Sequence, residues 1–143
     1  MDGAIHRSAG PELLAECRTL GGCAAGDAKI TRGYRLPARH VIHAVGPVWH
    51  GGDAGEDRLL ASCYRRALEL CEASALSSVA FPAISTGVYR FPADRAAGIA
   101  VAAVAEALAT APDVTRVIFC CFSPDSGRLH EAALAGVGSP CAD

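Results

Sequence analysis

The sequence has little basic charge and no long apolar run. Lys29 is the only lysine, and the 143 residues carry a formal net charge of -2. Near-neutral charge provides no basic surface for a nucleic-acid backbone. The longest apolar run, 99–105, ends at Glu106, far short of the roughly 20 residues that a bilayer requires. We therefore expect neither a nucleic acid nor a membrane as a partner.

Metal-binding cysteine pairs and targeting segments are also missing. The seven cysteines include no Cys-x-x-Cys pair, which removes zinc-ribbon and thioredoxin-like interpretations. Two histidines, His40 and His43, would point to opposite faces of a strand rather than toward one ion. No apolar region of a signal peptide follows Met1. The sequence therefore predicts a protein without a metal or other cofactor, located in a reducing cytoplasm.

The period of the apolar residues alternates between helix-like and strand-like along a chain of single-domain length. We expect helices at 2–20 (broken at Gly10-Pro11), 56–74, 93–110 and 125–135, and strands at 28–31, 40–45, 78–83 and 114–122. One domain would span residues 1–136, followed by a flexible tail at 137–143. The alternation predicts an α/β fold whose strands are covered on both faces. In such sheets, ligands bind where loops leave the carboxyl ends of the strands.

One such loop, at residues 81–92, reads Phe-Pro-Ala-Ile-Ser-Thr-Gly-Val-Tyr-Arg-Phe-Pro. Ser85 and Thr86 offer hydroxyls, and Gly87 lets the backbone turn without strain at Cβ. Successive N–H groups in such a turn form a nest for an anion. The loop has neither a lysine nor a Walker pattern, so it is not a P-loop. From the pattern alone, an ordinary capped strand-to-helix turn is an equally good interpretation.

A second candidate cluster lies at the start of the sequence. If this stretch is helical, Asp2 and His6 are separated by four residues and share one face. A carboxylate beside an imidazole can orient or activate water. An aspartate that favours the helix dipole, next to a surface histidine, is the simpler interpretation of an isolated pair.

Three blocks occur in order along the chain. The first is Asp-Gly-Ala-Ile-His-Arg at 2–7 with Ala-Gly-Pro at 9–11, and the third is the loop 81–92. The second is Gly-Asp-Ala-Lys-Ile-Thr at 26–31, then Gly-Tyr at 33–34, Leu-Pro at 36–37 and Ile-His-Ala-Val-Gly-Pro-Val-Trp at 42–49. Together they resemble the macrodomain family, specifically its MacroD-type branch of ADP-ribosyl hydrolases and O-acetyl-ADP-ribose deacetylases. The resemblance implies a three-layer α/β/α sandwich with a mixed sheet and a cleft for ADP-ribose.

The resemblance also assigns roles to both clusters. It matches the loop that wraps the diphosphate to five consecutive residues: Ser85, Thr86, Gly87, Val88 and Tyr89. Tyr89 would lie near the proximal ribose, and Phe122, at the end of the last strand, near the adenosine. Asp2 matches the acid that positions or activates the attacking water, and His6 is its neighbour on the same helix.

The implied activity is hydrolysis of an ester in an ADP-ribose derivative. The substrate would be O-acetyl-ADP-ribose or mono-ADP-ribose on an acidic side chain of a modified protein. Water would attack either the ester carbonyl or the ribose C1″, and the sequence favours neither. Two alternatives stay open: a non-catalytic ADP-ribose-binding module, and a truncated remnant without function.

One departure from the family is large. The family's first helix follows an Asn-Ala-Ala-Asn strand end and a glycine run, and neither these residues nor the opening strands occur here. The resemblance therefore predicts that a strand is missing between the strands at 40–45 and 78–83, where unpaired backbone groups would be costly. Met1 stands where relatives usually have valine, and a GUG valine codon can be read as a start. We therefore hypothesise that the start was assigned too far downstream and that the native protein carries an N-terminal extension. The intact mass of the protein from its native host tests this hypothesis.

Overall fold

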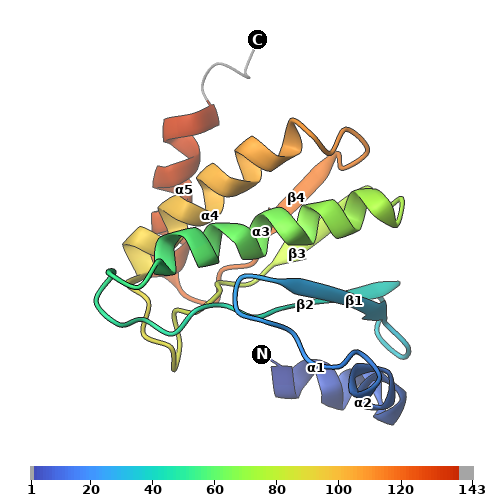
Figure 1. Cartoon of the computed structure of the whole chain (residues 1–143). Helices are drawn as coiled ribbons and strands as arrows, with labels where there is room; N and C mark the ends of the chain where they lie inside the picture. Colours follow the sequence, from blue (N-terminus) through green and yellow to red (C-terminus); the bar gives the residue numbers. More distant parts are fainter. Residues whose placement is uncertain (1, 139–143) are drawn as a thin grey trace.

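The structure, a computed structural model, describes residues 2–138 of the chain and the side chains of residues 3–136. Its elements are α1 (Asp2–Ala9), α2 (Pro11–Arg18), β1 (Ala28–Arg32), β2 (His40–Ala44), α3 (Glu56–Ala73), β3 (Ser78–Phe81), α4 (Ala93–Leu108), β4 (Arg116–Phe119) and α5 (Pro124–Gly138). Figure 1 shows α1 and α2 on the opposite side of the β1–β2 pair from α3. No helix within the described residues is long and apolar enough to cross a membrane.

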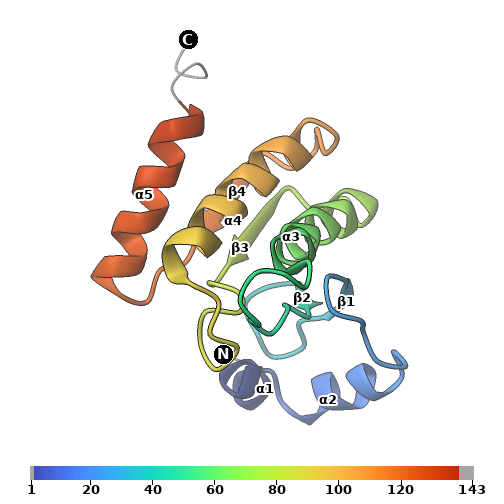
Figure 2. The ribbon, with the colours of Figure 1, turned by 60° about the vertical axis from the view of Figure 1, so that its left-hand side comes forward.

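The strands form two separate pairs. β1 and β2 are antiparallel, with Ala28 opposite Ala44, whereas β3 and β4 are parallel, with Ser78 opposite Arg116. Among residues 2–138 no strand joins β2 to β3, so each sheet has two strands. The gap that the sequence predicted between the strands at 40–45 and 78–83 is therefore present. Figure 2 shows the two pairs in another view, with α1 close to the loop that follows β3.

Helices cover the two strand pairs unequally. The β1–β2 pair contacts both α2 and α3. In β3, Phe81 is buried against the helices, whereas Ser78 and Ala80 are exposed, and the neighbouring Ile118 of β4 is 40% exposed. The prediction that all strands are covered on both faces is therefore wrong for β3 and β4, because α3 and α4 pack together on a single side of them.

The main core lies between α3, α4 and the β3–β4 pair. On α3, a stripe with helical spacing is fully buried: Leu60, Cys63, Tyr64, Ala67, Leu68 and Cys71. The ring of Tyr64 packs 5.0 Å from that of Phe81, centroid to centroid. The facing side of α4 consists largely of alanine, including the fully buried Ala100, so the two helices can approach closely. This core holds the loop after β3 between strand and helix.

The element boundaries differ most at the carboxyl ends of the parallel strands. β3 ends at Phe81 instead of residue 83, and β4 covers 116–119 instead of 114–122. Pro82 has no N–H for a ladder, and the last rung is the bond from Cys120 N to the oxygen of Phe81, at 2.7 Å. The helix predicted at 125–135 extends to Gly138. The rest of the predicted tail, 139–143, lies outside the described residues.

Candidate functional site

The segments that follow β2, β3 and β4 meet at one edge of the molecule. β3 and β4 are parallel, so their carboxyl ends coincide. Gly46, after β2, approaches the loop after β3 so closely that a Cβ there would lie 2.1 Å from Ser85 Oγ and 2.6 Å from Ile84 Cγ2. Only glycine therefore fits at position 46, where the two segments cross. Loops from three strands therefore converge where α/β proteins bind ligands.

The loop after β3 is a closed turn bounded by two unusual residues. Ser85 and Arg90 both have left-handed backbones, with φ of 66° and 65°. The N–H of Arg90 donates to the oxygen of Gly87 at 3.0 Å, and the N–H of Phe91 donates to the oxygen of Ser85 at 2.9 Å. Non-glycine residues rarely adopt this conformation, and such residues concentrate at functional sites. The surrounding contacts must compensate for the cost.

Between these two residues the loop presents free donors. The backbone N–H groups of residues 86–89 donate no hydrogen bond within the described part of the chain. The side chain of Val88 is 92% exposed, and a Cβ on Gly87 would meet nothing within 4 Å. Four consecutive amides beside open space form a nest suited to an anion such as a diphosphate. This observation favours the binding-loop interpretation over an ordinary capped turn.

Contacts from the β2–α3 connection anchor the loop. The N–H of Trp49 donates to the oxygen of Tyr89 at 2.8 Å, and its ring lies 4.8 Å from that of Phe91. The guanidinium of Arg95 lies over the indole ring, with its carbon 5.2 Å from the ring centroid. The same guanidinium binds Asp57 through Nε at 2.8 Å. Trp49 therefore links the loop to α3 and α4.

Glu56 organises the connection that carries Trp49. Its side chain is 1% exposed and accepts hydrogen bonds from the amides of His50 at 2.7 Å, Gly52 at 3.1 Å and Ala54 at 2.7 Å. Burial by itself would raise the pKa of Glu56, but these backbone donors outweigh it and lower the pKa to about 2. The buried carboxylate therefore stays charged and folds residues 50–54 around itself. The sequence analysis missed this residue, which resembled an ordinary first-turn acid of a helix.

The first helix begins beside the loop. α1 starts at Asp2, whose side chain lies outside the described part of the chain, so its predicted role stays a prediction. Ile5, almost one turn later, lines the same cavity as Ser85 and Tyr89. His6 is half-buried on this helix. The helix expected to carry the catalytic acid therefore adjoins the candidate binding loop.

The aromatic residue predicted at the adenosine end is available to a ligand. Phe122 follows β4 and is 72% exposed. Next to it, a cavity of about 180 Å³ lies beneath Thr86, between the beginnings of α4 and α5. Its polar lining includes Ser123, Asp125 and Ser126, and Ser123 Oγ accepts the N–H of Ser126 at 3.1 Å. The Ser-Pro-Asp-Ser sequence at 123–126 could have indicated this helix start, but the sequence analysis did not single it out.

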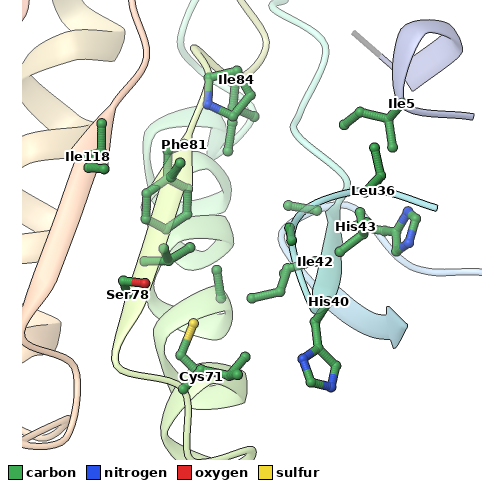
Figure 3. Close-up of a pocket in the computed structure, with 18 of the residues that line it drawn as sticks. Ile5, Leu36, His40, Ile42, His43, Cys71, Ser78, Phe81, Ile84 and Ile118 are labelled. Carbon is green, nitrogen blue, oxygen red and sulfur yellow. The ribbon is translucent and has the colours of Figure 1, made fainter. Parts of the chain in front are cut away.

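A second, larger cavity of about 1100 Å³ lies between β2 and β3 (Figure 3). Ser85 and Tyr89 contribute to it at the carboxyl ends of the strands. No group of three or more histidine, cysteine, aspartate or glutamate side chains within the described residues could hold a metal ion.

Comparisons with known proteins agree on one family. A family profile described as Macro domain matches residues 1–100. A macro domain-containing protein of Mesorhizobium japonicum is 59% identical over 137 residues, which are 96% of this chain and 78% of the relative. A protein of Klebsiella pneumoniae named O-acetyl-ADP-ribose deacetylase is 48% identical over 139 residues, with 94% of this chain and 79% of the relative covered.

Solved structures agree with the sequence relatives. The Oceanobacillus iheyensis macrodomain with ADP matches with a TM-score of 0.90 and 40% identity, over 97% of this chain and 76% of that chain. The Trypanosoma brucei macrodomain in complex with ADP-ribose matches with a TM-score of 0.86 and 40% identity, over 93% of this chain and 56% of that chain.

Proposed function

The chain belongs to the macro domain family and has its α/β/α fold, as the sequence predicted, and on that premise we propose that it hydrolyses ADP-ribose derivatives. The substrate class is an ester of ADP-ribose: O-acetyl-ADP-ribose, or mono-ADP-ribose attached to an acidic side chain. The observation that carries the proposal is the row of four amides at residues 86–89 that donate to no described residue, in a chain that superposes on a macrodomain with ADP.

The loop would bind the diphosphate. Its amides can donate to phosphate oxygens without a lysine or a metal, and the open space beside Gly87 leaves room for them. The anchoring contacts through Trp49 and Glu56 hold the donors in position before the ligand arrives, which reduces the entropy lost on binding. Tyr89, 39% exposed, would contact the proximal ribose, and Phe122 the adenine ring.

The reacting ester would then lie near the start of α1. A water held by Asp2, with His6 beside it, would add to the acetyl carbonyl, and the bond from the acyl carbon to the ribose oxygen would break. The ribose oxygen takes up a proton, so the products are acetate and ADP-ribose. For an acidic side chain, the same water could attack the carbonyl or the ribose C1″. Positioning and water orientation supply most of the acceleration in such a site.

Calorimetric titration with ADP-ribose, combined with a turnover assay on O-acetyl-ADP-ribose, tests the proposal. Binding with turnover supports a hydrolase, which is the activity named for the Klebsiella pneumoniae relative. Binding without turnover would contradict catalysis and leave an ADP-ribose-binding module. Absence of both would contradict binding at this loop as well.

Gly87→Glu tests the loop directly. A carboxylate would occupy the space meant for phosphate oxygens, so we expect affinity for ADP-ribose to fall by at least about 100-fold, or about 2.7 kcal/mol. Gly98→Glu is the matched control, because Gly98 on α4 is exposed and a Cβ there also meets nothing within 4 Å. Equal affinity in the two variants would refute the loop assignment.

A further inference from the structure

One face of the β1–β2 pair carries a group of polar side chains that the candidate site does not use. Lys29 and Thr31 are two residues apart on β1 and share a face, and His43 of β2 lies directly opposite Lys29. Helix α2 contacts β1 on the side of the pair that lies away from α3 (Figure 1). Cys17, in the last turn of α2, is half-buried beside these side chains. The fold therefore brings a thiol next to an imidazole that is distant in the sequence.

The imidazole of His43 donates a hydrogen toward the sulfur. Its Nε2 lies 2.9 Å from Thr31 Oγ1 and 3.8 Å from Cys17 Sγ. The hydroxyl of Thr31 has one hydrogen, which it donates to the backbone oxygen of Arg32 at 3.1 Å, so its own oxygen accepts from Nε2. Nε2 therefore carries a hydrogen, which the Thr31 oxygen and the Cys17 sulfur share. A sulfur that accepts an N–H is stabilised in its charged form, the thiolate.

The charges around this pair also favour the thiolate. The ammonium of Lys29 donates to a backbone oxygen just after α2, where it offsets the negative end of the helix dipole. The carboxylate of Glu16 accepts hydrogen bonds from the hydroxyl of Tyr34 at 2.6 Å and from the N–H of Arg32 at 3.2 Å. These two contacts lower the pKa of Glu16, and the charge of His43 adds to the effect. The ionised Glu16 in turn favours a positive charge on the imidazole, and a positive imidazole beside a sulfur activates cysteine nucleophiles.

The other described cysteines lack this environment. Three of them donate their own hydrogen to a carbonyl oxygen, which favours the neutral thiol: Cys23, Cys63 and Cys121. Burial raises the pKa of Cys63 to about 11 and also raises the pKa of Cys71. Cys120 and Cys121 are half-buried, as Cys17 is, but neither meets a side-chain nitrogen within the described part of the chain. Cys17 therefore differs from these two in its partner and not in its exposure.

We propose that Cys17 is a modification site: a nucleophilic thiol, activated by His43, that forms mixed disulfides with small disulfide compounds. The thiol releases its proton to water, and the thiolate attacks one sulfur of the disulfide. The S–S bond breaks as the bond to Cys17 Sγ forms, and the second sulfur leaves as a thiolate that takes up a proton. The small disulfide is itself the oxidant. None of these residues belongs to the loop at 84–91, so the inference does not depend on the proposed function.

Labelling of the wild-type chain by an aromatic disulfide, dithiobis(nitrobenzoate), is the first test. The reagent is added in an amount equal to the protein at neutral pH, and the coloured thiolate that leaves gives the rate. Peptide mapping by mass spectrometry then identifies the cysteine that reacted. We expect Cys17 to react about tenfold faster than Cys120 and Cys121, which have comparable exposure. Labelling of Cys17 at the same rate as these two, or more slowly, would overturn the inference.

Variants of His43 provide the second test. His43→Leu removes the N–H and the charge, so we expect labelling of Cys17 to slow about tenfold while Cys120 keeps its rate. His43→Gln keeps an N–H without the charge, and its rate should lie between those of the wild type and His43→Leu. The matched control is His40→Leu, on the opposite face of the same strand, which should react as the wild type does. A variant that only loosened α2 would label Cys17 faster and would expose Cys63. This outcome, or an unchanged rate in His43→Leu, would contradict activation by His43.

Discussion

The loop at 84–91 and the long cavity between β2 and β3 (the slot) both present backbone groups that have no partner among the described residues, yet they suit different ligands. In the loop, four N–H groups follow one another around a turn between Ser85 and Arg90. Along the strand edges, each N–H is followed by a C=O in a straight row. Consecutive donors add up to a positive field for an anion, whereas alternating donors and acceptors match only another polypeptide. The backbone conformation, and not the residue type, decides what the donors bind.

The two regions also differ in how they are held. The loop is anchored by the connection between β2 and α3: Trp49 binds the loop directly, and the buried carboxylate of Glu56 holds the connection in place. β2 and β3 meet directly at their carboxyl ends, where Gly46 approaches Ser85. Elsewhere α3 contacts β2 and, through the ring of Tyr64, Phe81 of β3. We therefore expect the loop to keep its shape without ligand.

The prediction with the largest expected effect concerns Asp2 and separates catalysis from binding. Asp2→Asn keeps the size of the side chain but removes the charge that would orient water. We expect turnover of O-acetyl-ADP-ribose to fall about 100-fold or more, with the Kd for ADP-ribose almost unchanged. Steady-state kinetics and calorimetry on the same preparation measure both quantities. Full turnover in this variant would remove the catalytic role of Asp2.

Gly46→Ala acts where the loop and the slot meet. Because its Cβ would lie 2.1 Å from Ser85 Oγ, the loop must move, and we expect affinity for ADP-ribose to fall about tenfold. Gly98→Ala, at an exposed helical site with open space, is the control and should bind as the wild type does. Adding Ser85→Gly to Gly46→Ala removes the hydroxyl and suits the left-handed backbone, so binding should recover in part. Unchanged affinity for ADP-ribose in Gly46→Ala would show that the contact between Gly46 and Ser85 is not rigid.

Glu56→Gln tests the anchoring of the loop. The amide keeps one acceptor oxygen but loses the charge that serves three backbone donors, so we expect Tm to fall by roughly 5 °C. Affinity for ADP-ribose should decrease about threefold. Glu69→Gln, on the exposed face of α3, is the control. Unchanged affinity for ADP-ribose in Glu56→Gln would contradict the anchoring role of Glu56.

The smallest expected effect is the pH dependence of the contribution that Glu56 makes to stability. The pKa of Glu56 lies near 2 in the folded protein, against an ordinary value of 4.5, so its contribution to stability is complete above pH 4.5 and is lost as the pH falls toward 2. The difference in Tm between the wild type and Glu56→Gln should therefore be constant above pH 4.5 and narrow below it. A difference that narrows already near pH 6 would assign the effect to another group.

Much of the local structure could be predicted from the sequence because its causes are local. The break between α1 and α2 follows from Gly10, with φ of 92°, and from Pro11 at the first helical position. The stripe on α3 follows from helical spacing. The left-handed conformation of Ser85, with φ of 66°, was not predictable, because serine has no preference for it. Glu56 was missed because the amides that it binds come from a loop that folds back over it.

The order of helices and strands, the loop with its Ser-Thr-Gly turn and the family itself were determined by the sequence alone, because spacing and short-range sterics act between neighbours in the chain. The tertiary structure decided which backbone groups have no partner among residues 2–138: the amides of residues 86–89 at the carboxyl edge, and the facing edges of β2 and β3. Whether a backbone N–H or C=O has a hydrogen-bond partner depends on the group that lies opposite it in space, and residues far apart in the sequence supply that group.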